Sequence, residues 1–460
     1  MRAFIRERRL LIIIFIVLFP LLFRPRVYGF DPVGYFSWLR SAVIDGNLDT
    51  TDEYLRYGNE KIAGATVTGY NHNPYAIGAP LLWSPFYLAA HAVESARSAI
   101  TQSPSPDGYG DAYVWAISLG SALLGFAAVL ILHRLARRLY GEPAATLGAL
   151  AAWLASPLVF YMYSHPAMAH AADAFANALA FAAWFSVSGD ARPGNGPGQA
   201  RPLPHSRDAG PRRWLLLGAS IGLAALVRTQ NVLIGLVPGV WLLAQAPAAF
   251  RSGEGRARLQ SVAAFGLGAL IAFAPQMIAW RVVYGSWIEL NPYAYTQDAG
   301  HFTGTFQILP VLFSTDRGLF VWSPVLLFAM PGLAPLYAQH RRLAAFLIVH
   351  FVTQALLVSA WSVYNGALAF GARLLLQNTP TYVVGLAAFV DWLRRRGWST
   401  RRIAAIGAGF VVWNFLLIVQ YSVGTVPRTG AFPIGDLIAG QFTVLPTQFG
   451  RILTALLTRQ

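Results

Sequence analysis

The acidic residues of this 460-residue chain gather in one stretch, residues 24–111, which follows the first apolar segment. This stretch holds nine of the chain's 20 acids, whereas most of the remaining sequence is apolar. Carboxylates placed together can act as general bases or bind a divalent cation. Because the stretch lies between two apolar segments, we expect its acids to do their chemistry at one face of a membrane. The nine acids are Asp31, Asp45, Asp49, Asp52, Glu53, Glu60, Glu94, Asp107 and Asp111.

Asp31 is the acid that we single out, because Asp31-Pro32 opens a stretch whose apolar residues recur at helical spacing. The helix is expected to be amphipathic and to lie in the outer interface of the membrane. Two roles for the carboxylate remain open: it caps the helix, or it acts at the membrane surface as a base or as a ligand of Mg²⁺ or Mn²⁺. Asp52 and Glu53 are expected to complete such a cation site; the alternative for each is a solvated acidic turn.

Arginines and histidines on the same expected side are candidates for binding a phosphate group or another part of a substrate. A guanidinium matches phosphate oxygens with two parallel hydrogen bonds. These residues flank apolar segments, where ionisable groups are costly and often functional. Arg228 could instead form an ion pair with Asp173, and the histidines could be ordinary polar turn residues. The candidate binding residues are His72, His165, His170, Arg228, Arg317 and Arg373.

The composition places these residues in a membrane protein. The chain is 55% hydrophobic and 12% charged, whereas a soluble domain has about 25% charged residues. Its net charge of +15 comes from arginines between apolar segments, so we do not expect nucleic acid as a partner. The absence of cysteine excludes disulfides and thiolate metal sites.

Eleven apolar segments predict an all-α polytopic membrane protein, since a span needs roughly 20 mainly apolar residues. Basic loops stay in the cytoplasm, and the arginines alternate between segments in a way that places the N-terminus inside and the C-terminus outside. The same alternation places residues 24–111 outside. The predicted spans are 9–23, 112–133, 144–162, 168–187, 214–228, 231–247, 262–283, 319–339, 344–362, 373–391 and 403–423.

The predicted organisation is a single transmembrane bundle over residues 1–423. Its outer loop, about 24–111, carries the candidate catalytic acid. A stretch rich in Pro, Gly and Arg, about 188–213, predicts a disordered cytoplasmic linker, and residues 424–460 form a short outer tail. The sequence contains no Walker A or GxGxxG motif, so it gives no support for an activity driven by a nucleotide on the cytoplasmic side.

Four stretches carry a family resemblance: DPVGYFSWLRSAVIDGNLD, YAIGAPLLWSPFYLAAH, FYMYSHPAMAH and STDRGLFVWSPVLLF. Together with the order of the apolar segments they resemble the GT-C superfamily of membrane glycosyltransferases. The bacterial members near the polyprenyl-phosphate-sugar-dependent mannosyltransferase/ArnT-like branch are the most similar in kind. The resemblance covers most of the chain, but the long soluble C-terminal domain of some relatives has no counterpart in this sequence.

The resemblance implies an inverting transfer of a hexosyl or pentosyl group from a polyprenyl-phosphate donor to a glycan, lipid or protein acceptor. The expected location is the outer face of the bacterial cytoplasmic membrane. In the family the acid of the first outer loop is a base or a metal-associated carboxylate, and Asp31 matches it; Asp52-Glu53 is the candidate for the second acid. The alternatives are a transporter or lipid flippase, which predicts inverted repeats, and a purely structural membrane subunit.

Overall fold

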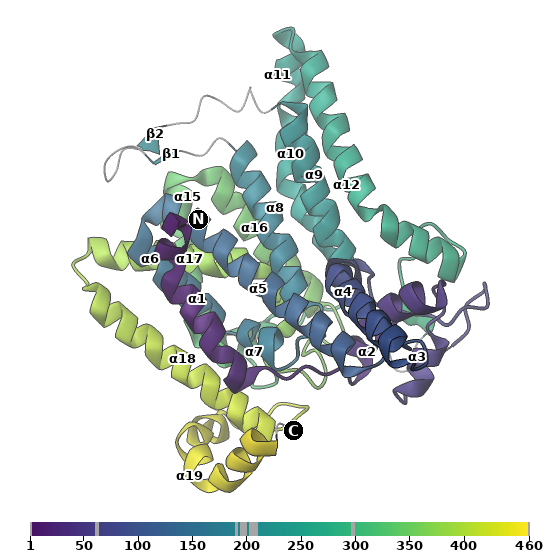
Figure 1. Cartoon of the computed structure of the whole chain (residues 1–460). Coiled ribbons are helices and arrows are strands. Elements are labelled where there is room, and N and C mark those ends of the chain that lie inside the picture. The colour runs from purple at the N-terminus through teal and green to yellow at the C-terminus, as the bar shows by residue number, and fades with distance from the viewer. Residues whose placement is uncertain are drawn as a thin grey trace.

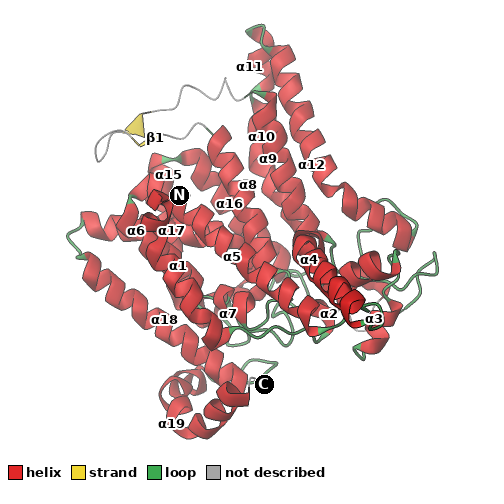
Figure 2. Ribbon diagram, in the orientation of Figure 1, coloured by secondary structure: helices red, strands yellow, loops and turns green. Residues whose placement is uncertain are grey.

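A computed structural model describes residues 2–59, 64–188, 192–193, 200–201, 210–295 and 300–458. Within these ranges the chain is almost entirely helical, as Figure 2 shows. The strands described are one antiparallel pair, β1 (Arg192–Pro193) and β2 (Ala200–Arg201). Most of the predicted linker 188–213 lies outside the described residues. The prediction of an all-α protein is confirmed.

The helices vary from short turns to segments longer than a membrane is thick. Besides the α-helices, the chain forms one π-helical segment, η1 (Ser41–Asp45), and several 3₁₀ segments, η4 (Thr229–Gly235), η5 (Pro292–Tyr295), η6 (Pro324–Phe328) and η7 (Arg373–Asn378). The α-helices are α1 (Arg2–Leu22), α2 (Phe30–Arg40), α3 (Thr51–Arg56), α4 (Gly78–Thr101), α5 (Asp111–Tyr140), α6 (Glu142–Leu154), α7 (Leu158–Tyr163), α8 (His170–Val187), α9 (Pro211–Val227), α10 (Leu236–Ala244), α11 (Ala246–Arg251), α12 (Gly255–Tyr284), α13 (Ile308–Phe313), α14 (Leu319–Trp322), α15 (Ala329–Gln339), α16 (Arg341–Ser359), α17 (Thr379–Arg395), α18 (Thr400–Val423) and α19 (Ile434–Thr458).

Each of the eleven predicted spans falls on one helix or on consecutive helical segments. Four of them are interrupted, at α6–α7, η4–α10, α14–η6–α15 and η7–α17. Non-helical backbone at membrane depth is tolerated where protein surrounds it or where it lines a cavity. The chain is therefore a multi-pass helical membrane protein, while the number of eleven and the orientation stay predictions. Among the described residues, five segments are long and apolar enough to cross a membrane: Asp111–Tyr140, Thr229–Arg251, Gly255–Tyr284, Arg341–Ser359 and Thr400–Val423.

Glycines allow two pairs of helices, α9 with α12 and α15 with α17, to approach closely. A Cβ atom added to Gly332 in α15 would lie 1.9 Å from the carbonyl oxygen of Gly385 in α17. A Cβ added to Gly218 in α9 would lie 2.0 Å from the carbonyl oxygen of Phe265 in α12. Small residues are enriched at such contacts in membrane bundles, because van der Waals packing drives association there.

The helix predicted after Asp31 exists as α2, but it is not an amphipathic helix on the surface. Residues 32–40 are buried on every side of the helix. Trp38 packs against Trp280 of α12, and α4 packs along α2 (Figure 1). The predicted exposed, amphipathic character of this helix is wrong, because the apolar run 78–101 forms α4, which covers it and carries the exposed side chains Leu88 and Ile100. The position of α2 at the membrane interface stays a prediction.

In Figure 1, segments predicted to face the cytoplasm and segments predicted to face outward lie at opposite ends of the molecule. Helix α11, which belongs to a basic segment expected in the cytoplasm, is at the top. Helices α2 and α3 of the acid-rich stretch are near the lower end, and α19 lies beyond the lower end of α18. The fold thus gathers the segments that are expected outside at one end of the helix bundle.

We predict that Gly332→Ala lowers the stability of the bundle, because its methyl group would meet a backbone carbonyl that cannot rotate away. Overpacking typically costs about 1–3 kcal/mol, and we expect at least this loss. The matched control is Gly409→Ala in α18, where an added Cβ meets no atom within 4 Å. Thermal-unfolding midpoints in detergent measure both. Equal midpoints for the two variants would contradict the packing described above.

Candidate active site

Asp31 lies in the first turn of α2 and faces the interior of the site. Its Oδ2 accepts a hydrogen bond from Arg373 Nη1 at 2.7 Å, and its Oδ1 accepts one from the Tyr75 hydroxyl at 3.0 Å. The residue at the N-cap is Gly29, and no side chain caps this helix. The capping alternative is therefore wrong, and the carboxylate is available for contacts away from its own helix.

Arg373 is held beside Asp31 by an unusual loop. Gly366, Ala367 and Gly371 all have positive φ angles, of 70°, 55° and 59°. A Cβ at Gly366 would lie 2.8 Å from Arg373 Nε, so glycine lets the guanidinium pass close to the backbone. This buried Nε has no hydrogen-bond partner among the described residues. The guanidinium thus keeps a donor that Asp31 does not use.

Arg228 follows the last turn of α9 and pairs with an acid of α8. Its Nε lies 3.7 Å from Asp173 Oδ2, and Asp173 is fully buried. The other oxygen of Asp173 accepts hydrogen bonds from Asn177 at 2.8 Å and Asn231 at 2.7 Å. The buried Nη1 of Arg228 has no partner in the described part of the chain. The ion pair predicted with Asp173 is present, and it leaves one end of the guanidinium for a ligand.

Tyr35 of α2 lies within electrostatic range of both arginines and of Asp31. Burial raises the pKa of Tyr35 to about 12, and the charges of Arg228, Asp31 and Arg373 also act on it. Burial likewise raises the pKa of Tyr293, on which the same three charges act. Asp31, Arg228 and Arg373 therefore share the surroundings of two tyrosine side chains, although they lie far apart in the sequence.

Two of the candidate histidines lie beside this cluster. His170, at the start of α8, is buried against the ring of Tyr161 at 4.6 Å between centroids. His165 contacts the Tyr28 hydroxyl through Nε2 at 2.6 Å, and its Nδ1 lies 3.3 Å from Arg26. Burial, together with the nearby positive charges, lowers the pKa of His165 to about 3, so this imidazole is neutral at neutral pH.

The remaining two candidates have internal contacts. The guanidinium of Arg317 donates to the carbonyl oxygens of Ala369, Pro427 and Arg428 and to the Asp316 carboxylate. These contacts use its donors to join the segment before Arg373 to the C-terminal tail. The His72 ring is fully buried, and its Nδ1 lies 3.1 Å from the carbonyl oxygen of Gly64. Both residues therefore have structural contacts that explain their burial.

The three carboxylates predicted as metal ligands do not come together. Glu53 is fully buried and accepts a hydrogen bond from Arg40 Nη1 at 3.3 Å, whereas Asp52 is exposed. In the part of the chain that the structure describes, no group of three or more acidic or histidine side chains could hold a metal ion. Asp31, Asp52 and Glu53 therefore form no cluster of three cation ligands among the described residues.

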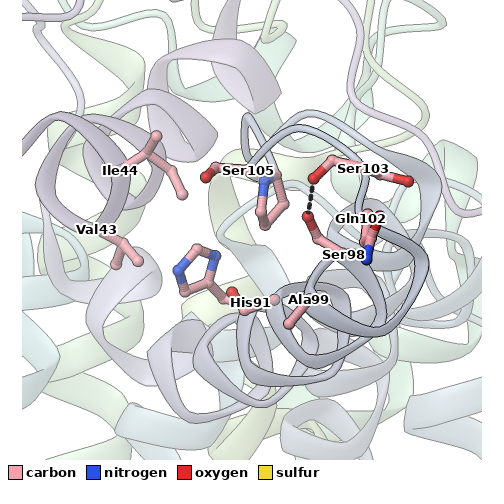
Figure 3. Close-up of a pocket in the computed structure, with 10 residues that line it drawn as sticks. Val43, Ile44, His91, Ser98, Ala99, Gln102, Ser103 and Ser105 are labelled. Carbon is pink, nitrogen blue, oxygen red and sulfur yellow. Dashed lines mark hydrogen bonds between the residues drawn. The ribbon is translucent and has the colours of Figure 1, made fainter.

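The sequence analysis missed the tyrosines of the site. Tyr75 belongs to a stretch that reads as an apolar run, and Tyr293 lies in a loop without a recognisable pattern, so only their proximity to Asp31 reveals them. A second feature, a hollow of about 600 Å³ between η1 and α4, contains none of the predicted site residues (Figure 3). His91, Ser95 and Ser98 line it, so the hollow is separate from the surroundings of Asp31, Arg228 and Arg373.

Comparison with known proteins shows likeness in fold alone. No protein-family model and no curated protein matches the chain. Among solved structures, ArnT from Cupriavidus metallidurans bound to undecaprenyl phosphate is similar over 96% of this chain and 75% of its own, with 15% identity and a TM-score of 0.50. The archaeal oligosaccharyltransferase AglB from Archaeoglobus fulgidus is similar over 94% of this chain, which spans about half of AglB (52%), with 12% identity and a TM-score of 0.45. The likeness to ArnT shows that the two chains share a fold.

We predict a strong energetic coupling between Asp31 and Arg373, whose side chains are 23% and 12% exposed. Each single variant, Asp31→Asn or Arg373→Gln, leaves a buried group without its partner, whereas the double variant removes both. A double-mutant cycle on unfolding midpoints in detergent should give a coupling of about 1–3 kcal/mol.

The control for this cycle is the Asp391–Arg395 pair, which has the same 2.7 Å separation, although its arginine is 61% exposed. We expect a coupling of about 0.3–0.5 kcal/mol there, as in other exposed helical pairs. If the coupling at Asp31–Arg373 is no larger than at the control, the buried pair does not organise the site.

Titration of Glu53 should make the fold less stable at neutral pH than in mild acid. Burial raises the pKa of Glu53 from 4.5 to about 7, even though Arg40 contacts the carboxylate. Because the pKa of Glu53 is higher in the folded than in the unfolded protein, its contribution to stability is fully present when the pH is below the pKa of the unfolded chain. This contribution disappears as the pH rises through about 7. We expect wild type to lose roughly 2–3 kcal/mol more than Glu53→Gln between about pH 5 and pH 8. If the unfolding midpoints of wild type and Glu53→Gln change with pH in the same way, the titration of Glu53 does not affect stability and the prediction is refuted.

Proposed function

We propose that this protein is a membrane glycosyltransferase that moves a sugar from a polyprenyl-phosphate donor to an acceptor hydroxyl. The proposal is supported by one observation above all: Asp31 pairs with Arg373 beside Arg228, within a fold like that of ArnT. The solved ArnT structure contains undecaprenyl phosphate. A site that offers two guanidinium groups suits the phosphate of such a lipid donor.

In the proposed reaction, Arg228 and Arg373 bind the donor phosphate. Each keeps an unpartnered buried donor within the described residues, Nη1 of Arg228 and Nε of Arg373. When the bond from the anomeric carbon to the phosphate oxygen breaks, negative charge develops on the leaving phosphate. Fixed cations aimed at this charge stabilise the transition state more than the ground state. The lipid phosphate leaves with the bonding electron pair.

Asp31 is proposed to orient the acceptor hydroxyl and to take its proton as the acceptor oxygen bonds to the anomeric carbon. Attack from the face opposite to the phosphate inverts the configuration at that carbon. Arg373 and Tyr75 both donate to the carboxylate, so its orientation toward the acceptor hydroxyl is fixed. Asp31 takes the proton late in the reaction, when bond formation to the anomeric carbon has made the hydroxyl proton acidic.

The setting that we propose is the bacterial cytoplasmic membrane, with the site facing outward and a hexosyl or pentosyl group transferred. A glycan, a lipid or a protein could supply the acceptor hydroxyl. The prediction that Mg²⁺ or Mn²⁺ takes part depends on Asp31 alone, because Asp52 and Glu53 do not join it. In the assay described below, turnover is compared before and after EDTA treatment. A loss of turnover after EDTA treatment would show that the reaction requires a divalent cation. No step proposed here depends on the cation.

A transporter or lipid flippase remains the alternative class. Such a protein would carry substrate across the membrane without breaking the bond between sugar and phosphate. Buried polar side chains such as Gln354 and Gln377, which are hydrogen-bonded to each other at 3.0 Å, lie in helical segments that could line a path. The glycosyltransferase is favoured because Asp31 pairs directly with Arg373, and the charges of this pair and of Arg228 act on the same tyrosine, Tyr35.

The test is release of free lipid phosphate from a panel of radiolabelled polyprenyl-phosphate sugars by the purified protein. We expect Asp31→Asn to lower turnover by about 10²–10⁴-fold, the usual contribution of a general base. Loss of Arg228 or Arg373, as the Gln variants, should lower it by about 10²–10³-fold, as for a donor to a developing anion.

The control is Asp107→Asn, which removes an exposed carboxylate from the same outer loop; its turnover should equal that of wild type. Equal losses in Asp107→Asn and Asp31→Asn would show that the loss is not specific to Asp31. Absence of turnover with every donor, in a wild-type protein that elutes as a single species, would favour the transporter class.

A further inference from the structure

The exposed apolar side chains of α19 form one face of the C-terminal helix. They recur at spacings of four, four, three and four residues, which places them on one side of a helix with 3.6 residues per turn. Phe442, near the middle of this face, is 78% exposed. We call these residues the α19 apolar face; they are Ile434, Ile438, Phe442, Leu445 and Phe449.

The other two sides of α19 differ in character from the apolar face. Leu437, Gln441 and Val444 are buried, on the side that packs against the rest of the molecule. The third side carries polar exposed residues, among them Thr443 and Thr447. A helix divided into a packed, an apolar and a polar side meets protein, hydrocarbon and water at the same time, and such a helix lies in the plane of a membrane interface.

Helix α19 is fixed to the bundle rather than attached by a free linker. It packs against α18, one of the segments able to cross a membrane, and Gly440 approaches the Gln420 side chain so closely that an added Cβ would lie 2.0 Å from it. The preceding loop is held by Arg317, which donates to the carbonyl oxygens of Pro427 and Arg428 at 2.9 Å and 2.6 Å. The direction in which the apolar face points is thus determined by the fold.

We propose that α19 binds the bilayer surface through its apolar face, at the end of the molecule that carries α2 and Asp31. The bilayer is favoured as the partner because α19 packs against α18, a segment able to cross a membrane, whose own exposed residues Ile406 and Val412 suit hydrocarbon. The charges described in α19 are Asp436 and Arg451, so apolar insertion and not attraction to anionic lipid drives the binding. The inference does not depend on the proposed glycosyl transfer.

Single-cysteine spin labelling tests this directly, because the natural chain contains no cysteine. Phe442→Cys labels the apolar face, and Thr443→Cys, the next residue, labels the polar side. The labelled full-length proteins are reconstituted in phosphatidylcholine vesicles, with an aqueous nickel complex on both sides. Collision rates of the nitroxide with oxygen, which concentrates in hydrocarbon, and with the nickel complex, which stays in water, report the depth of each label.

The expected result is a ratio of oxygen to nickel collisions that is at least about tenfold higher at position 442 than at 443, the factor that corresponds to about 1.4 kcal/mol of preference for lipid. Phe449→Cys, on the apolar face, and Thr447→Cys, on the polar side, repeat the comparison further along the helix. Similar ratios at 442 and 443 would overturn the proposal. Protection at 442 accompanied by dipolar broadening between labels would overturn it as well, because a second copy of the chain would then cover the face.

Discussion

The ion pair between Asp31 and Arg373 is the contact on which the rest of the site depends. It joins residues 342 positions apart at a separation of 2.7 Å, with both side chains largely buried. Removing charges from water is costly, and a buried charge without its partner costs more still. The chain must therefore bring the start of α2 and the start of η7 together in every folded molecule, and this requirement sets the position of the nearby tyrosines and arginines.

The arginines of the outer end divide into two kinds. Arg317 has carbonyl oxygens and a carboxylate around it, so its charge is compensated within the protein and it acts as a cross-link. Arg228 and Arg373 each contact one acid and keep a buried donor without a partner in the described residues. A buried donor without a hydrogen-bond partner is energetically unfavourable. An anionic ligand that accepts from both would recover that free energy on binding.

The interrupted helices explain how so many polar groups are accommodated inside an apolar bundle. Where α9 ends, η4 turns the chain so that Asn231 can donate to Asp173 and to the carbonyl oxygen of Ala224. At η7, the change of helix type places Arg373 at a helix start. The segment η4 packs against α9, α10 and α16, and η7 packs against α8, α16 and α17. The continuous helices α5 and α12 carry none of the candidate site residues. Backbone irregularity and the arginines of the candidate site therefore coincide in this fold, as in broken helices that line cavities in membrane proteins.

Hydropathy and the acid-rich stretch were sufficient to predict a helical membrane protein and to select Asp31, Arg228 and Arg373, because long apolar runs and costly ionisable residues are local signals. The motifs also predicted a fold of the kind found in ArnT, and the structure has a fold like that of ArnT. Sequence could not decide whether Asp31 caps its helix, whether Arg317 is free, or whether Asp52 and Glu53 reach Asp31. Those answers depend on which side chains meet, and that is decided only when Arg373 reaches Asp31 and α4 packs along α2, which no local pattern encodes.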